Sequence, residues 1–412
     1  MASRLVDAFD REWVSADPAR LDSAVTPLAV QGIGSLRLTA APGAAGVTAT
    51  HAPAEPLDLR AYDELRLWTY ATTAEPYPLE LSYRDAGDRP GEDHRWLIPV
   101  GRAGGWEQHA FAIAGDRRDA VTDLTVRVVT QAPFQISLDE LLAVRDDGLA
   151  DVEAALTGLL DGLPLPGLTA IPARPAAAGA DTLVVDHTPA LHPGNRVVVD
   201  GTGTRYAVTG ATDDVAAGTT TLTLRPALAT AVGNGATVSV IAPAVVEEAP
   251  FGEVTDTAEL PDPVLLLTLT DQREEPERSW TVVQRDSFRV RGAATLCSLR
   301  PPPRPVIAEY QILPAASDRG QSLALRTEIL RRVGVDSGLR VNGTVLPVQT
   351  LMPPPLDIRV RAVPAPIYLH IGTRIEQGAR VEVPWVRQGR LSVGIYPPAS
   401  GRQDQEGIVL PT

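Results

Sequence analysis

The residues that could carry out chemistry are spread along this chain of 412 residues without a recognisable catalytic arrangement. The six histidines include no pair at the i, i+4 spacing of a helical zinc site, and the single cysteine, Cys297, leaves no Cys-x-x-Cys motif. The sequence contains no Gly-x-Ser-x-Gly elbow, no phosphate-binding loop that ends in Gly-Lys, and no carboxylate pair that stands out as acid and nucleophile. We therefore predict a protein that is not an enzyme and that has no catalytic, cofactor-binding or metal-binding residues.

Two groups of residues are weak candidates for a metal site. Carboxylates of one loop could offer hard oxygen ligands to calcium, namely Asp85, Asp88, Glu92 and Asp93. The loop lacks the spaced Asp-x-Asp-x-Asp-Gly pattern, and nearby arginines could satisfy these carboxylates directly. His187 and His192 lie in a turn-rich segment, and we interpret them as exposed turn residues.

Aromatic residues make up only 5% of the chain, yet four of the six tryptophans fall in its first third: Trp13, Trp68, Trp96 and Trp106. Four tyrosines lie in the same segment: Tyr62, Tyr70, Tyr77 and Tyr83. Flat aromatic faces beside polar groups can hold sugar rings by apolar contact. Trp68, Trp96 and Trp106 are therefore candidate glycan-stacking residues. The alternative is that Trp68 and Trp96 lie on strands and fill a core.

The charge and hydropathy of the chain exclude several classes of partner. A formal net charge of −14 without a basic run argues against binding to nucleic acid through its phosphates. No window approaches 18 uncharged apolar residues, and the first residues lack a basic region followed by an apolar stretch. We expect synthesis in the cytoplasm without a signal peptide, and no insertion into a membrane.

Alternation of apolar and polar residues predicts short strands along most of the chain. In the first block they cover residues 36–39, 65–70, 79–83 and 124–128, with Pro and Gly turns between them. In the last block they cover residues 264–270, 287–290, 306–313, 358–363, 367–371 and 390–395. Asn342-Gly343 is the expected turn of a hairpin.

Helical spacing of apolar residues occurs in two segments, 148–163 and 321–333. Asp318 or Ser322 is expected to cap the start of the second helix, and Gly334 to end it. The fold class that follows is mainly β and multidomain. We expect a jelly-roll β-sandwich at 1–147, a linker helix at 148–167, a small β-domain at 168–245, a linker at 246–262 and an α+β domain at 263–412, with one amphipathic helix on an antiparallel sheet.

Three segments of the first block resemble the jelly rolls of carbohydrate-binding modules. They are DLRAYDELRLW at 58–68, GGWEQ at 104–108 and FQISLDEL at 134–141. In such modules these segments are an early core strand, the opening of a late strand and the closing strand. They mark the fold and carry no ligand residues, so the resemblance implies a sandwich and leaves sugar binding open.

The last block resembles structural proteins of phage tails and phage-like contractile injection systems. The resemblance rests on DPVLLLTL at 262–269, RPVIAEYQI at 304–312 and the helix that follows. In those proteins such a unit assembles side by side in rings. Two extra β-domains in front favour a baseplate, collar or fibre-adaptor component over a minimal ring-closing protein.

These resemblances imply a non-enzymatic structural component of a virion or phage-like particle, which docks by its C-terminal domain and displays its β-domains outward. Its expected partners are other tail or baseplate proteins and copies of itself in a ring. The candidate contacts are the helix 321–333 and the segment 385–410, with Arg326, Glu328, Arg331, Arg332, Trp385 and Arg387. The alternative function is a carbohydrate-binding adhesin module that recognises a cell-surface glycan.

Overall fold

The computed structural model describes residues 3–74, 77–89, 94–113, 116–200, 204–247, 260–275, 284–291, 294–334, 338–351, 366–376, 380–385, 390–392 and 407–409. Strands make up 53% of the described residues and helices 8%, so the protein is mainly β with multiple sheets, as the sequence predicts. The chain divides into two compact units: Met1–Asp147, Trp280–Pro303 and Glu376–Thr412 form the first, and Gly148–Ser279 and Arg304–Ile375 the second. In the described part of the chain, no helix is long and apolar enough to cross a membrane.

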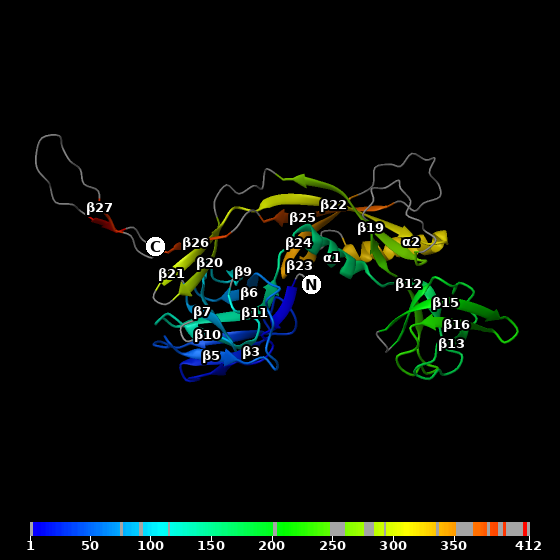
Figure 1. Ribbon diagram of the computed structural model, residues 1–412, viewed down its shortest axis with the longest axis horizontal. Helices are drawn as coiled ribbons and strands as arrows, with labels where there is room; N and C mark the ends of the chain where they lie inside the picture. The colour runs from blue at the N-terminus through cyan, green and yellow to red at the C-terminus, as the bar shows by residue number, and fades with distance from the viewer. Residues whose placement is uncertain are drawn as a thin grey trace, which may run out of the picture. The chain divides into compact units, whose positions relative to one another are not determined.

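The first unit contains a β-sandwich (Figure 1). We call one of its sheets the β6 sheet. Its strands are β1 (Ser3–Asp7), β3 (Leu21–Thr26), β4 (Ser35–Ala40), β6 (Glu64–Ala71), β9 (Trp106–Ala112) and β11 (Phe134–Val144). They lie in the order β3-β4-β11-β6-β9, and β1 also pairs with β11. We call the other sheet the β7 sheet. Its strands lie in the order β2 (Val14–Ser15), β5 (Thr48–His51), β10 (Val121–Val128), β7 (Leu79–Asp85), β8 (His94–Ile98), β20 (Gln284–Arg291), β21 (Ala294–Arg300) and β26 (Val381–Pro384). Apolar side chains from both sheets form one continuous core.

Strands from the last third of the chain extend the β7 sheet, and Figure 1 shows β20 and β21 beside the blue and cyan strands. Phe288 of β20 lies opposite Leu97 of β8, and both form a small apolar cluster with the buried Cys297 of β21. An unpaired strand edge favours the addition of another strand. The segment 263–412, expected as one domain, is therefore divided between the two units.

The second unit contains two further sheets and both helices of the described chain. One sheet has the order β12-β17-β14-β15-β16-β13, from β12 (Leu163–Ala170), β13 (Thr182–Asp186), β14 (Arg196–Val199), β15 (Arg205–Asp214), β16 (Thr219–Arg225) and β17 (Val238–Ala242). The other runs in the order β18 (Ala244–Val246), β19 (Val264–Glu274), β22 (Arg304–Ala315), β25 (Ile367–Ile375), β24 (Thr344–Leu351) and β23 (Gly338–Val341). A two-stranded pair in the first unit, β27 (Arg390–Ser392) and β28 (Gly407–Val409), completes the described strands. The expected strand at 358–363 lies outside the described residues.

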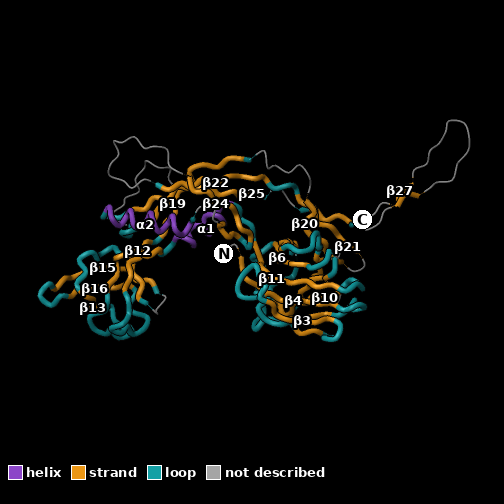
Figure 2. The backbone as a smooth tube through the Cα atoms, turned by 180° about the vertical axis from the view of Figure 1, so that it is seen from behind, coloured by secondary structure: helices purple, strands orange, loops and turns teal. Residues whose placement is uncertain are grey.

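Helices α1 (Leu149–Leu160) and α2 (Arg319–Val333) lie beside the second sheet of this unit (Figure 2). The expected linker helix is α1, and it packs as part of the core, since Val152 and Leu156 join the same apolar cluster as Leu325 and Ile329 of α2. At the start of α1, buried Asp151 accepts a hydrogen bond of 2.7 Å from Asn342 Nδ2. Asn342 and Gly343 form the expected hairpin turn, with φ angles of 49° and 78°.

The N-terminal cap of α2 gives a prediction about stability. Asp318 Oδ2 accepts hydrogen bonds from the backbone N–H groups of Gly320 (3.0 Å) and Gln321 (3.3 Å). We expect Asp318→Ala to lower the free energy of unfolding of the second unit by about 1 kcal/mol, because two helix donors lose their acceptor. Urea denaturation followed by circular dichroism measures this. Asp181→Ala, at an exposed position of the same unit, is the control, and an equal loss in both variants contradicts a capping role.

Candidate functional site

The outward face of the β6 sheet carries aromatic side chains beside polar ones. On β6, strand alternation places Leu65 and Leu67 in the core and turns Trp68 and Tyr70 to the opposite face. Trp106 of the neighbouring strand β9 lies directly opposite Tyr70. All three aromatic residues are partly exposed, so this sheet presents aromatic surface outside its core.

One row of side chains crosses this face through the aromatic pair. Arg37 of β4 lies opposite Ser137 of β11, Ser137 lies opposite Tyr70, and Tyr70 lies opposite Trp106. The ring centroids of Tyr70 and Trp106 are 5.6 Å apart, with their planes tilted by 58°. The row therefore leads from a guanidinium, across a short hydroxyl side chain, to two rings.

A second row lies next to the first and combines Trp68 with polar groups. Asp139 of β11 lies opposite Trp68, and Trp68 lies opposite Gln108 of β9. Asp139 Oδ2 accepts hydrogen bonds from the backbone N–H groups of Val30 (2.6 Å) and Gln31 (3.0 Å), which ties that loop to the sheet. We define the aromatic face by the residues of both rows: Arg37, Trp68, Tyr70, Trp106, Gln108, Ser137 and Asp139.

A buried network of charges lies on β6 beyond the aromatic face. Arg66 Nε is 2.5 Å from Glu64 Oε1, and Arg66 Nη2 is 2.8 Å from Asp146 Oδ2. Arg380 pairs with the other oxygen of Glu64. Burial opposes ionisation of Glu64, but the charges of Arg66 and Arg380 outweigh it and lower the pKa of the carboxyl. These pairs fix the position of β6 and leave its charges satisfied within the protein.

The structure separates the three tryptophans predicted to stack on a glycan. Trp68 and Trp106 lie on neighbouring strands of the aromatic face. Trp96 on β8 is 0% exposed and belongs to the core between the two sheets, so its assignment as a glycan-stacking residue is wrong. The alternation around Trp96 was ambiguous because both faces of β8 are covered: Leu97, on the other face, is also buried against Phe288.

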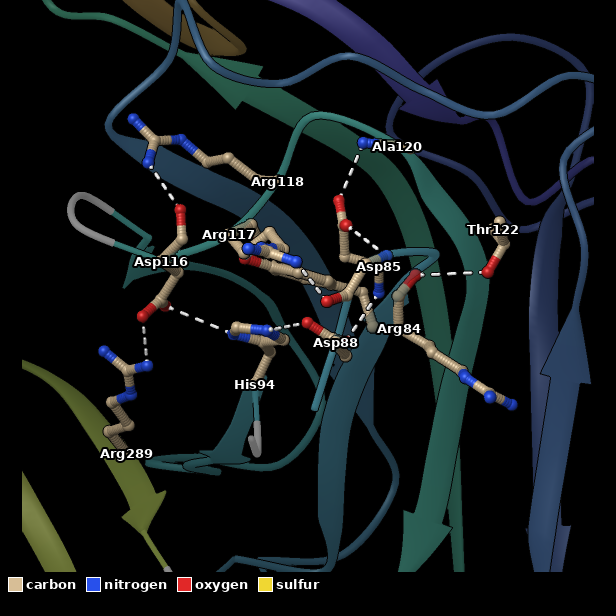
Figure 3. Close-up of polar contacts among 12 residues, drawn as sticks. Arg84, Asp85, Asp88, His94, Asp116, Arg117, Arg118, Ala120, Thr122 and Arg289 are labelled. Carbon is tan, nitrogen blue, oxygen red and sulfur yellow. Dashed lines mark hydrogen bonds and ion pairs between the residues drawn. The ribbon is translucent and has the colours of Figure 1, made fainter. Parts of the chain in front are cut away.

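The carboxylates considered for calcium hold their own loop together (Figure 3). Asp85 accepts backbone hydrogen bonds at both oxygens, from Gly87 (2.9 Å) and from Ala120 (2.7 Å). Asp88 accepts from the backbone of Asp85 (2.8 Å) and contacts His94 Nε2 (2.9 Å). Glu92 and Asp93 lie outside the described residues.

The two turn histidines belong to separate contacts. His187 Nδ1 is 3.7 Å from Asp213 Oδ1, and His192 Nε2 is 3.5 Å from Asp262 Oδ2. Among the residues that the structure describes, no group of three or more His, Cys, Asp or Glu side chains is arranged to hold a metal ion.

His94 and Arg289 connect the acidic loop to β20. Figure 3 shows Asp116 between them: its carboxylate pairs with Arg289 and lies 3.7 Å from His94 Nδ1. Arg289 also lies over the ring of Trp96, 5.7 Å from its centroid, which is a favourable cation–π contact. Burial opposes a charged imidazole, but the nearby carboxylates of Asp116 and Asp88 outweigh it and raise the pKa of His94. The cluster therefore acts as a structural clasp between β8 and β20.

The residues predicted as assembly contacts lie in two places. Arg326, Arg331 and Arg332 lie on α2 with Glu328, which pairs with Arg331. Trp385 belongs to the first unit. The centroid of its ring lies 4.6 Å from that of Phe288 and 5.0 Å from that of Tyr77. Arg387 lies outside the described residues. Trp385 thus lies apart in the sequence from α2 and packs within its own unit.

Comparison with solved structures finds carbohydrate-binding modules, whereas no family model and no curated protein matches the chain. The family 11 module of a cellulosomal cellulase of Clostridium thermocellum is 9% identical, with 34% of this chain and 94% of that chain covered and a TM-score of 0.28. The family 30 module of another cellulosomal cellulase of that organism is 14% identical, with 36% and 100% covered and a TM-score of 0.29. An exo-β-agarase is 11% identical, with 40% and 32% covered and a TM-score of 0.27. Scores this low carry no functional argument, and nothing in these comparisons points to a phage tail or baseplate protein.

Two histidines of the sandwich have pKa values that are shifted in opposite directions from the ordinary value. His94 has a raised pKa, whereas burial lowers the pKa of His109, whose Nε2 lies 2.8 Å from Thr69 Oγ1, to about 4. Protonated His94 therefore stabilises the folded protein below pH 6.5, and this contribution is lost as the pH rises through its folded pKa. Burial keeps His109 neutral in the folded protein, whereas the unfolded chain takes up a proton near pH 6.5. The folded protein therefore loses stability as the pH falls from 6.5 towards 4.

Chemical denaturation of His94→Gln and His109→Gln between pH 5 and 8 measures both contributions. The free-energy difference between wild type and His94→Gln should grow on acidification, and that between wild type and His109→Gln should shrink. Two differences that change in the same direction with pH contradict this assignment.

Proposed function

We propose that the protein binds a glycan on the aromatic face of the β6 sheet. The observation that carries this proposal is the common exposure of Trp68, Tyr70 and Trp106 on adjacent strands, within two rows that also contain polar side chains. The C–H surface of a pyranose is apolar and suits stacking on a ring, while its hydroxyls need hydrogen-bond partners. Both kinds of group are available on this face.

The scaffold supports binding because it holds these side chains in place before a ligand arrives. Each lies on a strand within a hydrogen-bonded sheet, and the buried pairs of Arg66 fix β6 near one end. Side chains that are already ordered lose less conformational entropy on binding. A face of this kind suits recognition of an extended polysaccharide chain, which matches the adhesin alternative raised by the sequence.

Removing one indole from the face should weaken binding at least tenfold, equivalent to about 1.4 kcal/mol. Affinity electrophoresis of wild type, Trp68→Ala and Trp106→Ala against a panel of neutral and acidic polysaccharides measures this. Trp385→Ala is the matched control, since Trp385 is partly exposed in the same unit and packs on Phe288. Melting temperatures establish that each variant is folded.

Unchanged retardation of both face variants by a polysaccharide that binds wild type would exclude the aromatic face as its site. Absence of binding to every polysaccharide would remove the support for a glycan-binding function.

A second candidate function, assembly with further copies in a phage-like particle, is favoured by one feature of α2. Leu323 and Leu330 are 49% and 40% exposed, although the sequence places both on the apolar side of the helix. They are seven residues apart, so they lie on one helical face, with Arg326 between them. Two exposed leucines on one helical face, beside an arginine, offer an apolar surface that a partner could cover.

Replacement of both leucines tests this assembly function. Light scattering coupled to size exclusion should show a multiple of 43.7 kDa for the wild type and a smaller mass for the Leu323→Ser, Leu330→Ser double variant. Thr327→Ser, at an exposed position of the same helix, is the control. A wild-type monomer at the highest attainable concentration contradicts self-assembly through α2.

A further inference from the structure

We propose that the ligand of the aromatic face is an anionic saccharide, whose carboxylate or sulfate binds Arg37. The proposal rests on the glycan-binding function and adds the chemical class of the ligand. It is carried by the position of Arg37 in the row with Ser137, Tyr70 and Trp106.

Arg37 is a half-buried arginine of the sandwich whose side chain has no partner among the described residues. Among the described residues it makes no ion pair or side-chain hydrogen bond, and its Nε is buried without an acceptor. Several other sandwich arginines form ion pairs: Arg66 with Glu64 and Asp146, Arg289 with Asp116, and Arg95 and Arg127 with Glu80. A half-buried guanidinium without a counter-charge is unfavourable for folding alone, which suggests that it serves a ligand.

Two carboxylates lie diagonally across from Arg37 on this face, Asp139 of β11 and Asp22 of β3. Asp139 lies two residues beyond Ser137 on β11, and its Oδ2 accepts the backbone hydrogen bonds of Val30 and Gln31. Among the described residues, neither Asp139 nor Asp22 forms an ion pair with Arg37, whose Nε has no acceptor. The guanidinium therefore remains available to a ligand.

Short side chains flank Arg37 on this face. Ala24 of β3 and Ser137 of β11 lie directly opposite it on its two sides, and Ser137 is 5% exposed. Arg37 and Tyr70 are two strand spacings apart, which is about 10 Å between their Cα atoms. A ring stacked on Tyr70 and Trp106 can therefore extend an acidic substituent, or a neighbouring acidic ring, across Ser137 to the guanidinium.

The chemistry of arginine suits such a group. Its planar, permanently charged fork forms paired hydrogen bonds with a carboxylate and also binds sulfate strongly. The net charge of −14 repels anions at long range, but this field is screened beyond about 10 Å at ordinary salt. A local cation on the aromatic face is then needed for an acidic glycan to bind.

The test compares acidic polysaccharides with neutral counterparts of the same or a similar backbone. The probes are polygalacturonate against its methyl ester, alginate against its propylene glycol ester, and carrageenan against agarose. The variants are Arg37→Gln, Arg37→Lys and the control Arg60→Gln, which removes the same charge from an exposed position of the same unit. Affinity electrophoresis or calorimetry gives the affinities, and melting temperatures show that the variants are folded.

We expect wild type to bind at least one acidic probe tenfold or more tightly than its neutral counterpart. Arg37→Gln should abolish that preference, Arg37→Lys should retain part of it, and Arg60→Gln should keep it. The esters and the carrageenan pair separate carboxylate from sulfate as the preferred group.

Equal binding of acidic and neutral probes, or a preference that survives Arg37→Gln, would overturn the proposal while leaving glycan binding intact. Failure of every probe, acidic or neutral, would instead count against glycan binding itself, and this inference would fall with it.

Discussion

The register of β6 is the constraint on which the candidate site depends. Side chains alternate between the two faces of a strand, so a shift of one residue would turn Trp68 and Tyr70 into the core and expose Leu65 and Leu67. Three features hold the register: pairing with β11, pairing with β9, and the buried ion pairs of Arg66 with Glu64 and Asp146. The core and the aromatic face are therefore two consequences of one strand alignment.

The charged residues of the sandwich divide into those that hold the structure and those that remain available. Asp85, Asp88, His94, Asp116 and Arg289 are connected to one another or to the backbone, and they join loops to strands. Buried polar groups of this kind are stabilised by the hydrogen bonds and ion pairs that they form. Arg37 has no such partner among the residues that the structure describes, and for this reason we assign it to a ligand.

Much of the fold could be predicted from local patterns in the sequence. The strands around Leu67, Leu81 and Val126 follow apolar alternation, and α2 begins at the predicted cap Asp318 and ends at Gly334. The addition of β20, β21 and β26 to the β7 sheet could not be predicted, because pairing between distant segments leaves no local signal. The jelly-roll resemblance of the first block agrees with a sandwich, but its boundaries miss these later strands.

The candidate site was only partly predictable, because it too depends on how distant strands pair. Aromatic enrichment in the first block pointed to Trp68 and Trp106, and the alternation of ELRLWTYA adds Tyr70 to the same face. Trp96 could not be separated from them, because β8 is covered on both faces and its alternation carries no contrast. Arg37 and Ser137 have no distinguishing sequence signal, since their role follows from strand order across β4, β11 and β6.

The most direct test of this account is nuclear magnetic resonance of the tryptophan indole N–H groups during titration with an oligosaccharide. We predict shifts for Trp68 and Trp106, which lie on the aromatic face, and unchanged resonances for Trp13 and Trp96, which are 2% and 0% exposed in the core. Saturable binding that leaves the resonances of Trp68 and Trp106 unchanged would contradict the account, because the glycan would then bind elsewhere.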